Sequence, residues 1–531
     1  MLNAFSYGFC FFIAASLFFV CKRGLRYLLY FQQEGYASRR FLNWLWQKKA
    51  FDKKGSAALL LTALIFLFLP KLGFFLGAFF FLYLGFFEMN PLKEGKLKLA
   101  LTERARRISL AWLILYFPFQ VGACFLTPYF FLIAQGALIQ STPFFLIAAV
   151  SLLSFDERRR QKKFIEEAVA RLKDVSPYII GITGSYGKTS TKNALAIILQ
   201  STLGSVFWPK KGVNTEMGIT REIRTGLKKQ TEYAVIEMGA YGKGSIAKLC
   251  RLAPPSAGII TTIGVAHLDR FGDQETIYQA KSELAQAIPF DGILICNGDN
   301  EGARQIAKEY PKKHGLLYGF DNSKMDLDCW IKNVSVSSKG SSFVIRWREK
   351  DYLGFTSLVG RMALSNLAAS FAMACSLGAC PELVIGALSN LKSVDNRLQL
   401  YVDGEVSFLK DAYNSNPEGF SDALDVLALF EKQRKILMTP GMIELGVLEK
   451  ELHEKIGKKA GGICDFAIVV GETNRDSLAR GLLSGGMAKE SILFVNERDQ
   501  AFSQLKSLLK PSDVVLIEND LPDLYKDQIK F

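Results

Sequence analysis

The stretch from Tyr178 to Thr191 limits the possible folds of this chain more than any other. It reads YIIGITGSYGKTST, a short apolar run, a glycine-rich turn and residues suited to the first turn of a helix. Strands that feed helices through such turns are typical of α/β folds with parallel sheets. Backbone N–H groups in the turn can surround a phosphate, and the helix N-terminus adds partial positive charge. The stretch therefore predicts a parallel sheet that carries a phosphate site.

Two side chains at the start of that helix specify the ligand further. Lys188 would reach the outer phosphates of a nucleotide, and the hydroxyl of Thr189 would bind Mg²⁺. The strict G-x4-G-K-[ST] pattern requires glycine where this chain has Ile182; its glycines stand at 181, 184 and 187. Because the lysine and the hydroxyl keep their register with the helix start, an ATP site is predicted. The alternative is a strand-to-helix turn without a ligand.

The net charge of +14 belongs to the N-terminal part of the chain. Residues 1–163 contain 21 Lys and Arg against 7 Asp and Glu, whereas the remainder is neutral. A nucleic-acid surface would need a basic stripe on the globular part, and the sequence shows none, so nucleic acid is not expected as a partner. Basic residues that flank apolar runs instead indicate membrane topology.

Residues 1–155 are predicted to form a membrane region. Residues 4–21 are apolar and uncharged, long enough to span a bilayer, and are followed rather than preceded by basic residues. A cleaved signal peptide has the opposite charge order, so we expect an uncleaved anchor with its N-terminus outside. Loop 22–55 carries nine Lys and Arg, and loop 88–107 is also basic, so both are expected to be cytoplasmic.

The remaining apolar runs bring the predicted total to about five crossings. Residues 57–87 are interrupted at Pro70, and each half is short for a bilayer of about 30 Å, so tilted crossings and a re-entrant hairpin both fit. Residues 108–155 have room for two more, with a break near Pro128 or near Pro143. The chain is thus expected to be a multi-pass protein of the cytoplasmic membrane, with its catalytic domains in the cytoplasm.

Two further patterns bear on location. The aromatic stretch from Phe41 to Trp46 lies between basic pairs, which suits an interfacial helix with aromatic anchors or an ordinary packed loop. The nine cysteines include no C-x-x-C pair, which argues against a zinc ribbon or a disulfide framework and fits a reducing compartment.

The globular part is predicted to contain two α/β domains after a connector helix at 156–175. In the first, 176–396, apolar runs alternate with helical stretches, and an edge hairpin is expected at about 328–348. The pattern restarts in 397–531 as a second, Rossmann-like domain, with strands expected near 406–411, 435–439, 465–470, 491–495 and 513–517. No G-x-G-x-x-G follows its first strand, so NAD binding has no support.

Polar residues follow several of these strands. Glu237 ends one of them, and a carboxylate at the carboxyl edge beside a phosphate loop is where a Mg²⁺ ligand belongs. His267 follows the next strand, and Lys281 lies on the helix after it. In the second domain, DAYNSNP begins at Asp411, and E-L-G at 444–446 precedes His453. Each signal is weak alone, since a loop histidine, a solvated lysine and a helix cap explain them equally well.

Taken in order, these segments resemble the Mur ligase family, the ATP-dependent amide ligases of peptidoglycan precursor synthesis, and most closely the branch that adds D-alanyl-D-alanine. TGSYGKTS at 183–190 is similar to the family's T-G-x-N-G-K-T-T loop, and NTEMG at 214–218 is similar to its N-N-x-x-G segment. The other similar segments are IEMGA at 236–240, IGVAHLDRFG at 263–272, Ala280-Lys281, DAYNSNP at 411–417, and ELG at 444–446 with His453. The resemblance covers roughly 176–520.

The resemblance implies roles for individual residues. ATP would be bound by Gly184, Ser185, Gly187, Lys188, Thr189, Ser190, Asn366, Arg397 and Asp411. Two Mg²⁺ ions would be held by Thr189, Glu237, His267 and Lys281, the last carbamylated by CO₂. The residues implied to act in catalysis are Lys188, His267, Lys281, Asn414 and Asn416.

The implied reaction converts an acceptor carboxylate into an acyl phosphate, which an amine then attacks with release of phosphate. Mg²⁺ and lysine would neutralise the transferred phosphoryl group, and hinged domains would orient the substrates and exclude water. The acceptor is expected to be a peptidoglycan precursor or similar carboxylate, and the amine an amino acid or dipeptide.

Three departures limit the resemblance. No UDP-binding domain is recognisable and the membrane region stands in its place, which suggests a membrane-held, lipid-linked acceptor. Ala363 replaces one of two adenine-side asparagines, and acidic residues at 518–523 stand where that branch tends to have a basic K-G-S-R-like stretch. The alternatives are the same chemistry on polyglutamate or capsule polymers, and a membrane scaffold that binds ATP without catalysis.

Overall fold

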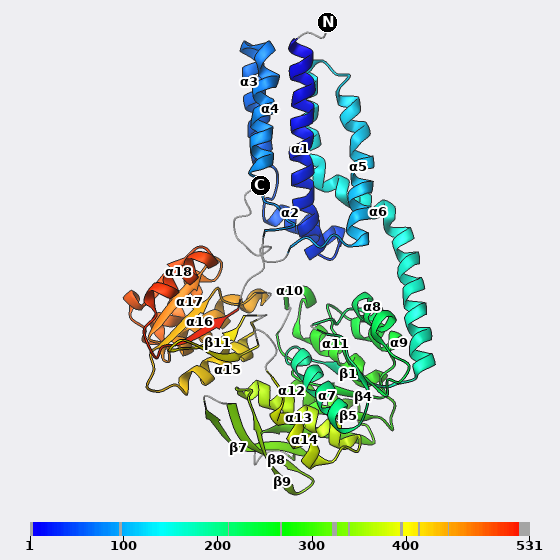
Figure 1. Ribbon diagram of the computed structural model, residues 1–531, viewed down its shortest axis with the longest axis vertical. Helices are drawn as coiled ribbons and strands as arrows, with labels where there is room; N and C mark the ends of the chain where they lie inside the picture. The colour runs from blue at the N-terminus through cyan, green and yellow to red at the C-terminus, as the bar shows by residue number, and fades with distance from the viewer. Residues whose placement is uncertain are drawn as a thin grey trace. The chain divides into compact units, whose positions relative to one another are not determined.

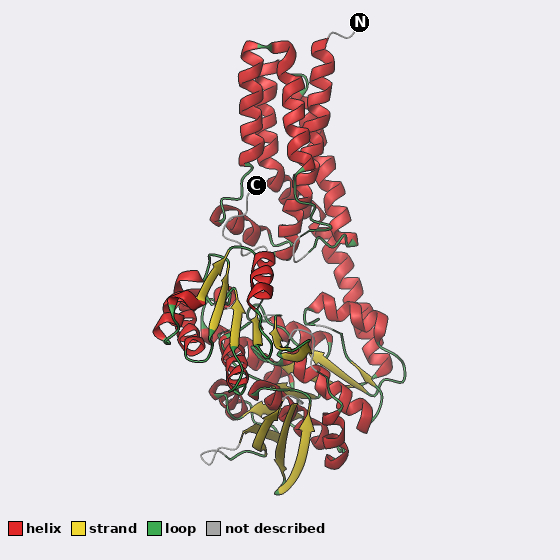
Figure 2. Cartoon of the chain, turned by 60° about the vertical axis from the view of Figure 1, so that its left-hand side comes forward, coloured by secondary structure: helices red, strands yellow, loops and turns green. Residues whose placement is uncertain are grey.

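The computed structural model describes residues 4–94, 98–210, 212–265, 268–320, 326–337, 340–392, 397–412, 415–443 and 445–519. The chain divides into two compact units (Figure 1), one that extends to Arg160 and one that spans Gln161–Leu521. The first contains only helices among its described elements, whereas the second is mixed α/β with largely parallel sheets (Figure 2). The α/β class predicted for the globular part is confirmed.

The helical unit contains α1 (Ala4–Gln33), α2 (Ser38–Gln47), α3 (Lys53–Phe68), α4 (Pro70–Phe86), α5 (Glu103–Ala123) and the start of α6 (Pro128–Val175). Two segments among the described residues, Tyr7–Gln33 and Pro128–Val175, are long and apolar enough to cross a membrane by length and composition. Leu72–Phe86 is a shorter apolar helix. The number of crossings stays a prediction.

Prolines mark the breaks between these helices. Pro70 is the first residue of α4, a position where its missing N–H is tolerated. A turn at 124–127 separates α5 from α6, whereas Pro143 lies inside α6. The chain therefore breaks at the first of the two positions considered. The expected connector helix at 156–175 is not separate, because α6 runs through 48 residues without interruption.

Helix α2 resolves the alternative left open for the aromatic stretch. Phe41, Trp44 and Leu45 are buried, and the rings of Phe31 and Phe41 stack with their centroids 4.5 Å apart. Only Trp46, which is 62% exposed, is available to face an interface. The stretch is a helix, as the interfacial interpretation required, but most of its aromatic surface packs inside the protein.

A buried ion-pair network ties the helices together. Arg23 and Arg26 of α1 contact the carboxylate of Glu88 at 3.0 and 2.8 Å. Arg23 also lies 3.6 Å from Asp52, whose other oxygen accepts the N–H of Gly55 at the start of α3. Because two guanidinium groups face two carboxylates, the network is neutral.

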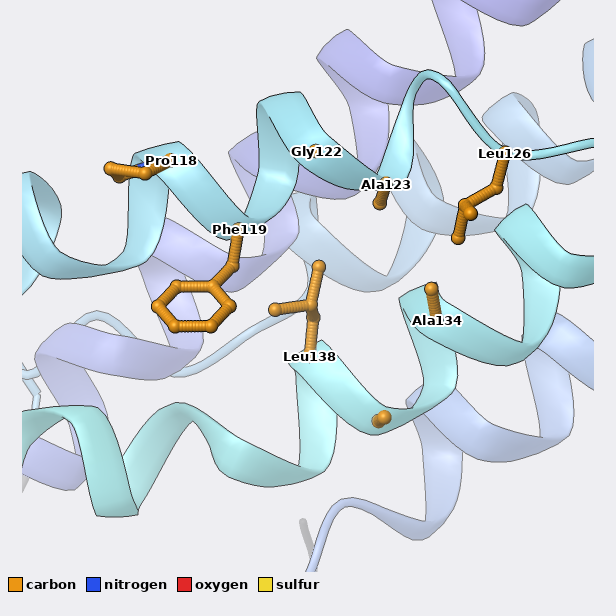
Figure 3. Close-up of a pocket in the computed structure, with 8 residues that line it drawn as sticks. Pro118, Phe119, Gly122, Ala123, Leu126, Ala134 and Leu138 are labelled. Carbon is orange, nitrogen blue, oxygen red and sulfur yellow. The ribbon is translucent and has the colours of Figure 1, made fainter.

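An apolar cavity of about 490 Å³ lies between α5 and α6 (Figure 3). Its lining is Pro118, Phe119, Gly122, Ala123, Leu126, Ala134, Ala137 and Leu138. No lining side chain carries a charge or a hydrogen-bonding group, so this cavity is unsuited to phosphoryl chemistry.

The second unit contains a nine-stranded sheet in the order β2-β3-β1-β4-β5-β6-β7-β8-β9. In this spatial order, the first seven strands, from β2 through β1 to β7, are parallel. Strands β7, β8 and β9 form an antiparallel edge. The bounds are β1 Tyr178–Thr183, β2 Val206–Phe207, β3 Tyr233–Glu237, β4 Ala257–Ile260, β5 Ile293–Asn297, β6 His314–Phe320, β7 Cys329–Ser337, β8 Gly340–Trp347 and β9 Lys350–Thr356.

Helices cover both faces of this sheet, which explains why its parallel strands are apolar throughout. One face buries residues of α7 (Lys188–Thr202), α13 (Arg361–Ser376) and α14 (Pro381–Ser389). The other buries residues of α8 (Glu216–Gly226), α9 (Ser245–Leu252), α11 (Gln274–Ala287), α12 (Glu301–Glu309) and the end of α6. A short helix α10 (Leu268–Phe271) precedes α11.

The second sheet has the order β10-β11-β15-β12-β13-β14, with only β10 antiparallel to its neighbour. Its strands are β10 Gln399–Asp403, β11 Val406–Asp411, β12 Lys435–Thr439, β13 Phe466–Val470, β14 Ile492–Val495 and β15 Val514–Glu518. Helices α15 (Pro417–Ala428), α16 (Glu449–Gly461) and α17 (Arg475–Ser484) cover one face, and α18 (Arg498–Leu508) covers the other. The doubly wound arrangement predicted from the strand spacing is present.

Candidate functional site

The phosphate loop connects β1 to α7 as the sequence predicts. Gly187, with φ +80°, is the N-cap of α7, and a Cβ there would lie 2.4 Å from Oδ1 of Asn366. Gly184, with φ +150°, is equally confined, because a Cβ would lie 1.9 Å from Oγ1 of Thr261. Both glycines are therefore required by conformation and by close approach.

Lys188 folds back over this loop. Its Nζ donates to the carbonyl oxygens of Gly184 at 2.7 Å and of Ser185 at 3.1 Å. Burial lowers the pKa of Lys188, and the guanidinium of Arg397 adds to the lowering while Glu237 opposes it. Carbonyl oxygens are weak partners for an ammonium, so an anionic phosphate in this loop would be a better one.

Glu237, at the end of β3, is the centre of a polar cluster beside the loop. One carboxylate oxygen accepts the Thr189 hydroxyl at 2.8 Å, and the other accepts the Asn214 amide at 2.9 Å. Lys192, buried one turn along α7, has its Nζ 3.7 Å from the same carboxylate. Carboxylate, hydroxyl and amide oxygens are the donors that Mg²⁺ prefers, so Thr189 and Glu237 fit the predicted metal site.

Lys281 lies on α11 and is only 4% exposed. Burial lowers its pKa well below the usual value, and the charge of Lys188 lowers it further, whereas Glu237 and Glu283 oppose the change. The structure thus brings Lys188, Glu237 and Lys281 into one electrostatic neighbourhood. A buried lysine beside another lysine favours the neutral amine.

The loop after β4 is bonded directly to the phosphate loop. The Ser185 hydroxyl donates to the carbonyl of Gly264 at 2.9 Å and accepts the N–H of the same residue at 3.0 Å. His267 follows this segment in sequence, but it lies outside the described residues, as does Asn414. Their predicted roles stay predictions.

A pocket on the other side of α7 unites three of the predicted nucleotide residues, Ser190, Asn366 and Arg397. Its full lining is Ser190, Asn193, Ala194, Ile197, Leu358, Ala363, Asn366, Leu367, Leu391, Lys392 and Arg397. Asn366 accepts the Thr191 hydroxyl at 3.1 Å, which fixes it against α7. Ala363 also lines the pocket, so the position where an asparagine was missing from the sequence pattern does belong to this site.

The C-terminal domain contributes its own carboxyl-edge residues. Asp411 ends β11, and Asn416 is the N-cap of α15, its side-chain oxygen accepting the N–H of Gly419 at 2.8 Å. The buried His453 accepts the N–H of Met442 at 2.8 Å and supports the turn after β12. In the structure, Asn416 therefore caps a helix, and His453 packs against the turn after β12.

Sequence reasoning assigned no role to three residues that the structure places near these groups. Lys192 stands four residues after Lys188, one helical turn, which was a usable signal. Asn214 belongs to the NTEMG segment at 214–218, but its hydrogen bond to Glu237 could not be predicted from the sequence. Glu518 was noted only as part of an acidic stretch, and it proves to be fully buried beside Asp411.

Comparison with known proteins agrees with this geometry. Residues 182–374 match the Mur ligase middle domain, and residues 396–518 match the Mur ligase, glutamate ligase domain. UDP-N-acetylmuramoyl-tripeptide–D-alanyl-D-alanine ligase of Mycobacterium bovis is 32% identical over 361 residues, which cover 64% of this chain and 70% of that protein. The ligase of the same name from Bacillus subtilis is 33% identical over 292 residues, 55% of this chain and 62% of that protein.

Solved structures show the same similarity. MurF ligase from Thermotoga maritima, crystallised in complex with ADP, has a TM-score of 0.61 at 27% identity and aligns with 68% of this chain and 80% of its own. MurF from Acinetobacter baumannii, at 22% identity, shares the fold with a TM-score of 0.60 over 70% of this chain and 78% of its own.

Proposed function

This chain belongs to the Mur ligase family, and we propose that it is a membrane-bound ligase that joins D-alanyl-D-alanine, or a similar amino acid or dipeptide, to the carboxylate of a peptidoglycan precursor. The prediction of an ATP-dependent carbon–nitrogen ligase is confirmed by its relatives, which are named as ligases of this reaction. The identity of the two co-substrates and the membrane location are the proposed parts.

One observation supports the proposal above all others, the convergence of Thr189, Glu237 and Lys188 at one sheet edge. Parallel strands place the ends of β1 and β3 next to each other, with Ile182 opposite Glu237 in register. The Thr189 hydroxyl, bonded to Glu237, is therefore directly beside the loop that would hold phosphate. Bound Mg²⁺ would neutralise charge on the transferred phosphoryl group.

The chain's own residues then have distinct tasks. The glycine loop offers backbone N–H groups to phosphate, and Lys188 would exchange its carbonyl partners for phosphate oxygens. Ser190, Asn366 and Arg397 would bind the nucleoside end from the adjoining pocket. Holding the nucleotide from both ends orients its outer phosphate toward an acceptor carboxylate, which is the main task in phosphoryl transfer.

Lys281 is proposed to carry a carbamate. Its neutral amine would attack CO₂, forming an N–C bond and releasing one proton, which leaves an anionic oxygen ligand where an ammonium would repel metal. Burial and the nearby Lys188 support this by keeping the amine unprotonated. Lys281→Ala should abolish ligation, and a short carboxylic acid should restore part of it; unchanged turnover would remove the assignment.

The acceptor is proposed to be lipid-linked, because residues 1–155, which precede the two matched domains, are predicted to lie in the membrane. Purified protein in lipid nanodiscs should use a lipid-linked muramyl peptide faster than the matching UDP-linked one. Equal rates on both substrates would contradict this part of the proposal and leave the ligase chemistry unaffected.

The decisive experiment on function measures phosphate release from ATP with the acceptor and the amine each omitted in turn. A ligase releases phosphate in quantity only when both are present, and D-alanyl-D-alanine is the first amine to test. A non-catalytic scaffold would show no dependence on the amine. Lys188→Ala provides the inactive control, and a ligase-type dependence that persists in this variant would point to a contaminating enzyme.

A further inference from the structure

Two carboxyl groups face each other at the carboxyl edge of the second sheet. Asp411 ends β11 and Glu518 ends β15, and the two residues are direct partners in the register of these adjacent parallel strands. Glu518 is 0% exposed, and one of its oxygens accepts the Ser415 hydroxyl at 2.5 Å. Its other oxygen, Oε2, is buried without a hydrogen-bond partner among the described residues.

The charges around this pair do not support two carboxylates. The charge of Arg397 acts on both groups, the charge of Asp422 also acts on Asp411, and the backbone N–H of Leu398 donates to Asp411. Burial raises the pKa of both carboxyl groups, and for Glu518 the nearby Asp411 raises it further. Because Glu518 is fully buried, a charge on it beside the charge of the half-buried Asp411 is destabilising unless one of the two is neutralised.

Arg397 connects the pair to the nucleotide pocket. It lines the pocket together with Ser190 and Asn366, and its charge also acts on Lys188 in the phosphate loop. The guanidinium therefore lies within electrostatic reach of both the acidic pair and the phosphate loop. Glu518 cannot contact a nucleotide itself, because it is completely buried.

We propose that Glu518 is a positioning residue for nucleotide binding, which in its neutral carboxylic acid form limits the pair to one negative charge and so keeps the Arg397 guanidinium in the nucleotide pocket that it lines. A second charge on the pair would draw the guanidinium toward Asp411 and Glu518, and it would also repel the triphosphate. The inference rests on the proposed function only in assuming that this pocket binds ATP.

The test is equilibrium binding of a non-hydrolysable ATP analogue to the full-length protein in detergent, followed from mildly acidic to mildly alkaline pH. Wild-type affinity should fall by about three- to tenfold as Glu518 ionises. Glu518→Gln, which stays neutral, should bind like the low-pH wild type and lack this fall. Glu405→Gln, an exposed carboxylate on the same domain, is the matched control.

Titration of the nucleotide and of Lys188 affects all of these proteins alike, so the difference between profiles reports on the pair of Glu518 and Asp411. A second variant guards against misfolding of the first. Ser415→Ala removes the hydroxyl that stabilises the ionised form, so it should move the fall in affinity to higher pH. Glu518→Gln or Ser415→Ala profiles parallel to wild type would overturn the inference, as would a wild-type profile without the fall. Absence of binding in every protein would instead refute the proposed function.

Discussion

Buried charge is concentrated around Glu237, which makes this residue the most informative single position of the site. It neutralises Lys192, which is 0% exposed, and it also accepts hydrogen bonds from Thr189 and Asn214. Glu237→Gln should lower stability by about 3–5 kcal/mol, because it removes the carboxylate that pairs with the buried ammonium of Lys192. Ligase activity should also be lost with the metal-binding carboxylate.

The pH dependence of that variant has a defined sign. Burial already lowers the pKa of Lys192, and the Glu237 charge opposes this, so its removal lowers the folded-state pKa further below the unfolded value. The folded state then binds fewer protons, and stability falls as pH decreases. The difference in thermal midpoint between wild type and Glu237→Gln should therefore be larger at pH 7 than at pH 9. Glu431→Gln, an exposed control, should show no such change, and an equal loss at both pH values would contradict the explanation.

At the residue scale, the sequence predicted where several of the polar side chains of the site lie, whereas their roles stay predictions. Lys188, Thr189 and Glu237 were placed correctly, because a P-loop and the end of a neighbouring parallel strand must meet at one edge. Lys192 was overlooked although it lies one helical turn after Lys188, since lysines on helices are usually solvated. Glu518 was visible only as part of an acidic run, because its burial depends on the pairing of β15 with β11, which lie about a hundred residues apart.

At the scale of elements, α13 depends on a cap supplied by another domain. Its N-cap is Gly360, which has no side chain, and the carboxylate of Asp422 on α15 accepts the N–H groups of Arg361 at 2.7 Å and Met362 at 2.8 Å. Asp422→Ala should therefore cost about 0.5–2 kcal/mol, the usual value of a lost cap, and weaken nucleotide binding through Asn366 on the same helix. Urea unfolding and analogue binding measure the two effects.

Asp425 on the same helix is the matched control for that substitution. It is exposed, and its ion pair within the described part of the chain is with Lys459, so Asp425→Ala should change stability by less than about 1 kcal/mol and leave nucleotide binding intact. Asp422→Asn keeps an acceptor oxygen and should lie between the two. Equal behaviour of Asp422→Ala and Asp425→Ala would show that the cap is unimportant.

The helical unit offers a parallel case in Glu88. Its carboxylate faces Arg23 and Arg26, so Glu88→Gln leaves two buried guanidinium groups with Asp52 as the remaining carboxylate of the network. Breaking such a buried network should lower the free energy of unfolding by about 3–5 kcal/mol. The measurement is the thermal midpoint of the protein in detergent, which should fall. Glu94→Gln, an exposed change in the following loop, should leave the midpoint unchanged. A midpoint for Glu88→Gln equal to that of Glu94→Gln would contradict the prediction.

Element boundaries followed from the sequence where local chemistry decides them. The strands β11 and β12 begin and end where their apolar patterns do, and Pro70 starts a helix as its fixed φ favours. The sequence was wrongly interpreted as a separate connector helix from residue 156. A change from apolar to charged residues does not end α6, because the backbone hydrogen bonds of the helix continue to Val175. Strand β10 was missed, since it is short, half-exposed and held only by its antiparallel neighbour.

At the scale of the whole molecule, charge and hydropathy divide the chain in the same place as the compact units do. The basic excess ends near residue 163, and the first unit ends at Arg160. Residues 164–531 are neutral in sequence, and the second unit carries all the nucleotide and metal candidates that the structure describes. The membrane region stays a prediction, and in it the basic loops and the catalytic unit would both be cytoplasmic.

That arrangement makes an accessibility prediction for two cysteine positions in spheroplasts. Cys380 is free and exposed in the catalytic unit, so a membrane-impermeant maleimide should label it only after the membrane is disrupted. Phe125, 86% exposed in the turn between α5 and α6, lies on the outer side if α1 enters from outside. Phe125→Cys, made together with Cys124→Ala, should be labelled in intact spheroplasts, and peptide mapping distinguishes it from the other cysteines. Labelling of Cys380 before disruption would show that the catalytic unit lies outside the membrane barrier, opposite to the predicted orientation. Release of the protein by alkaline carbonate would refute membrane insertion.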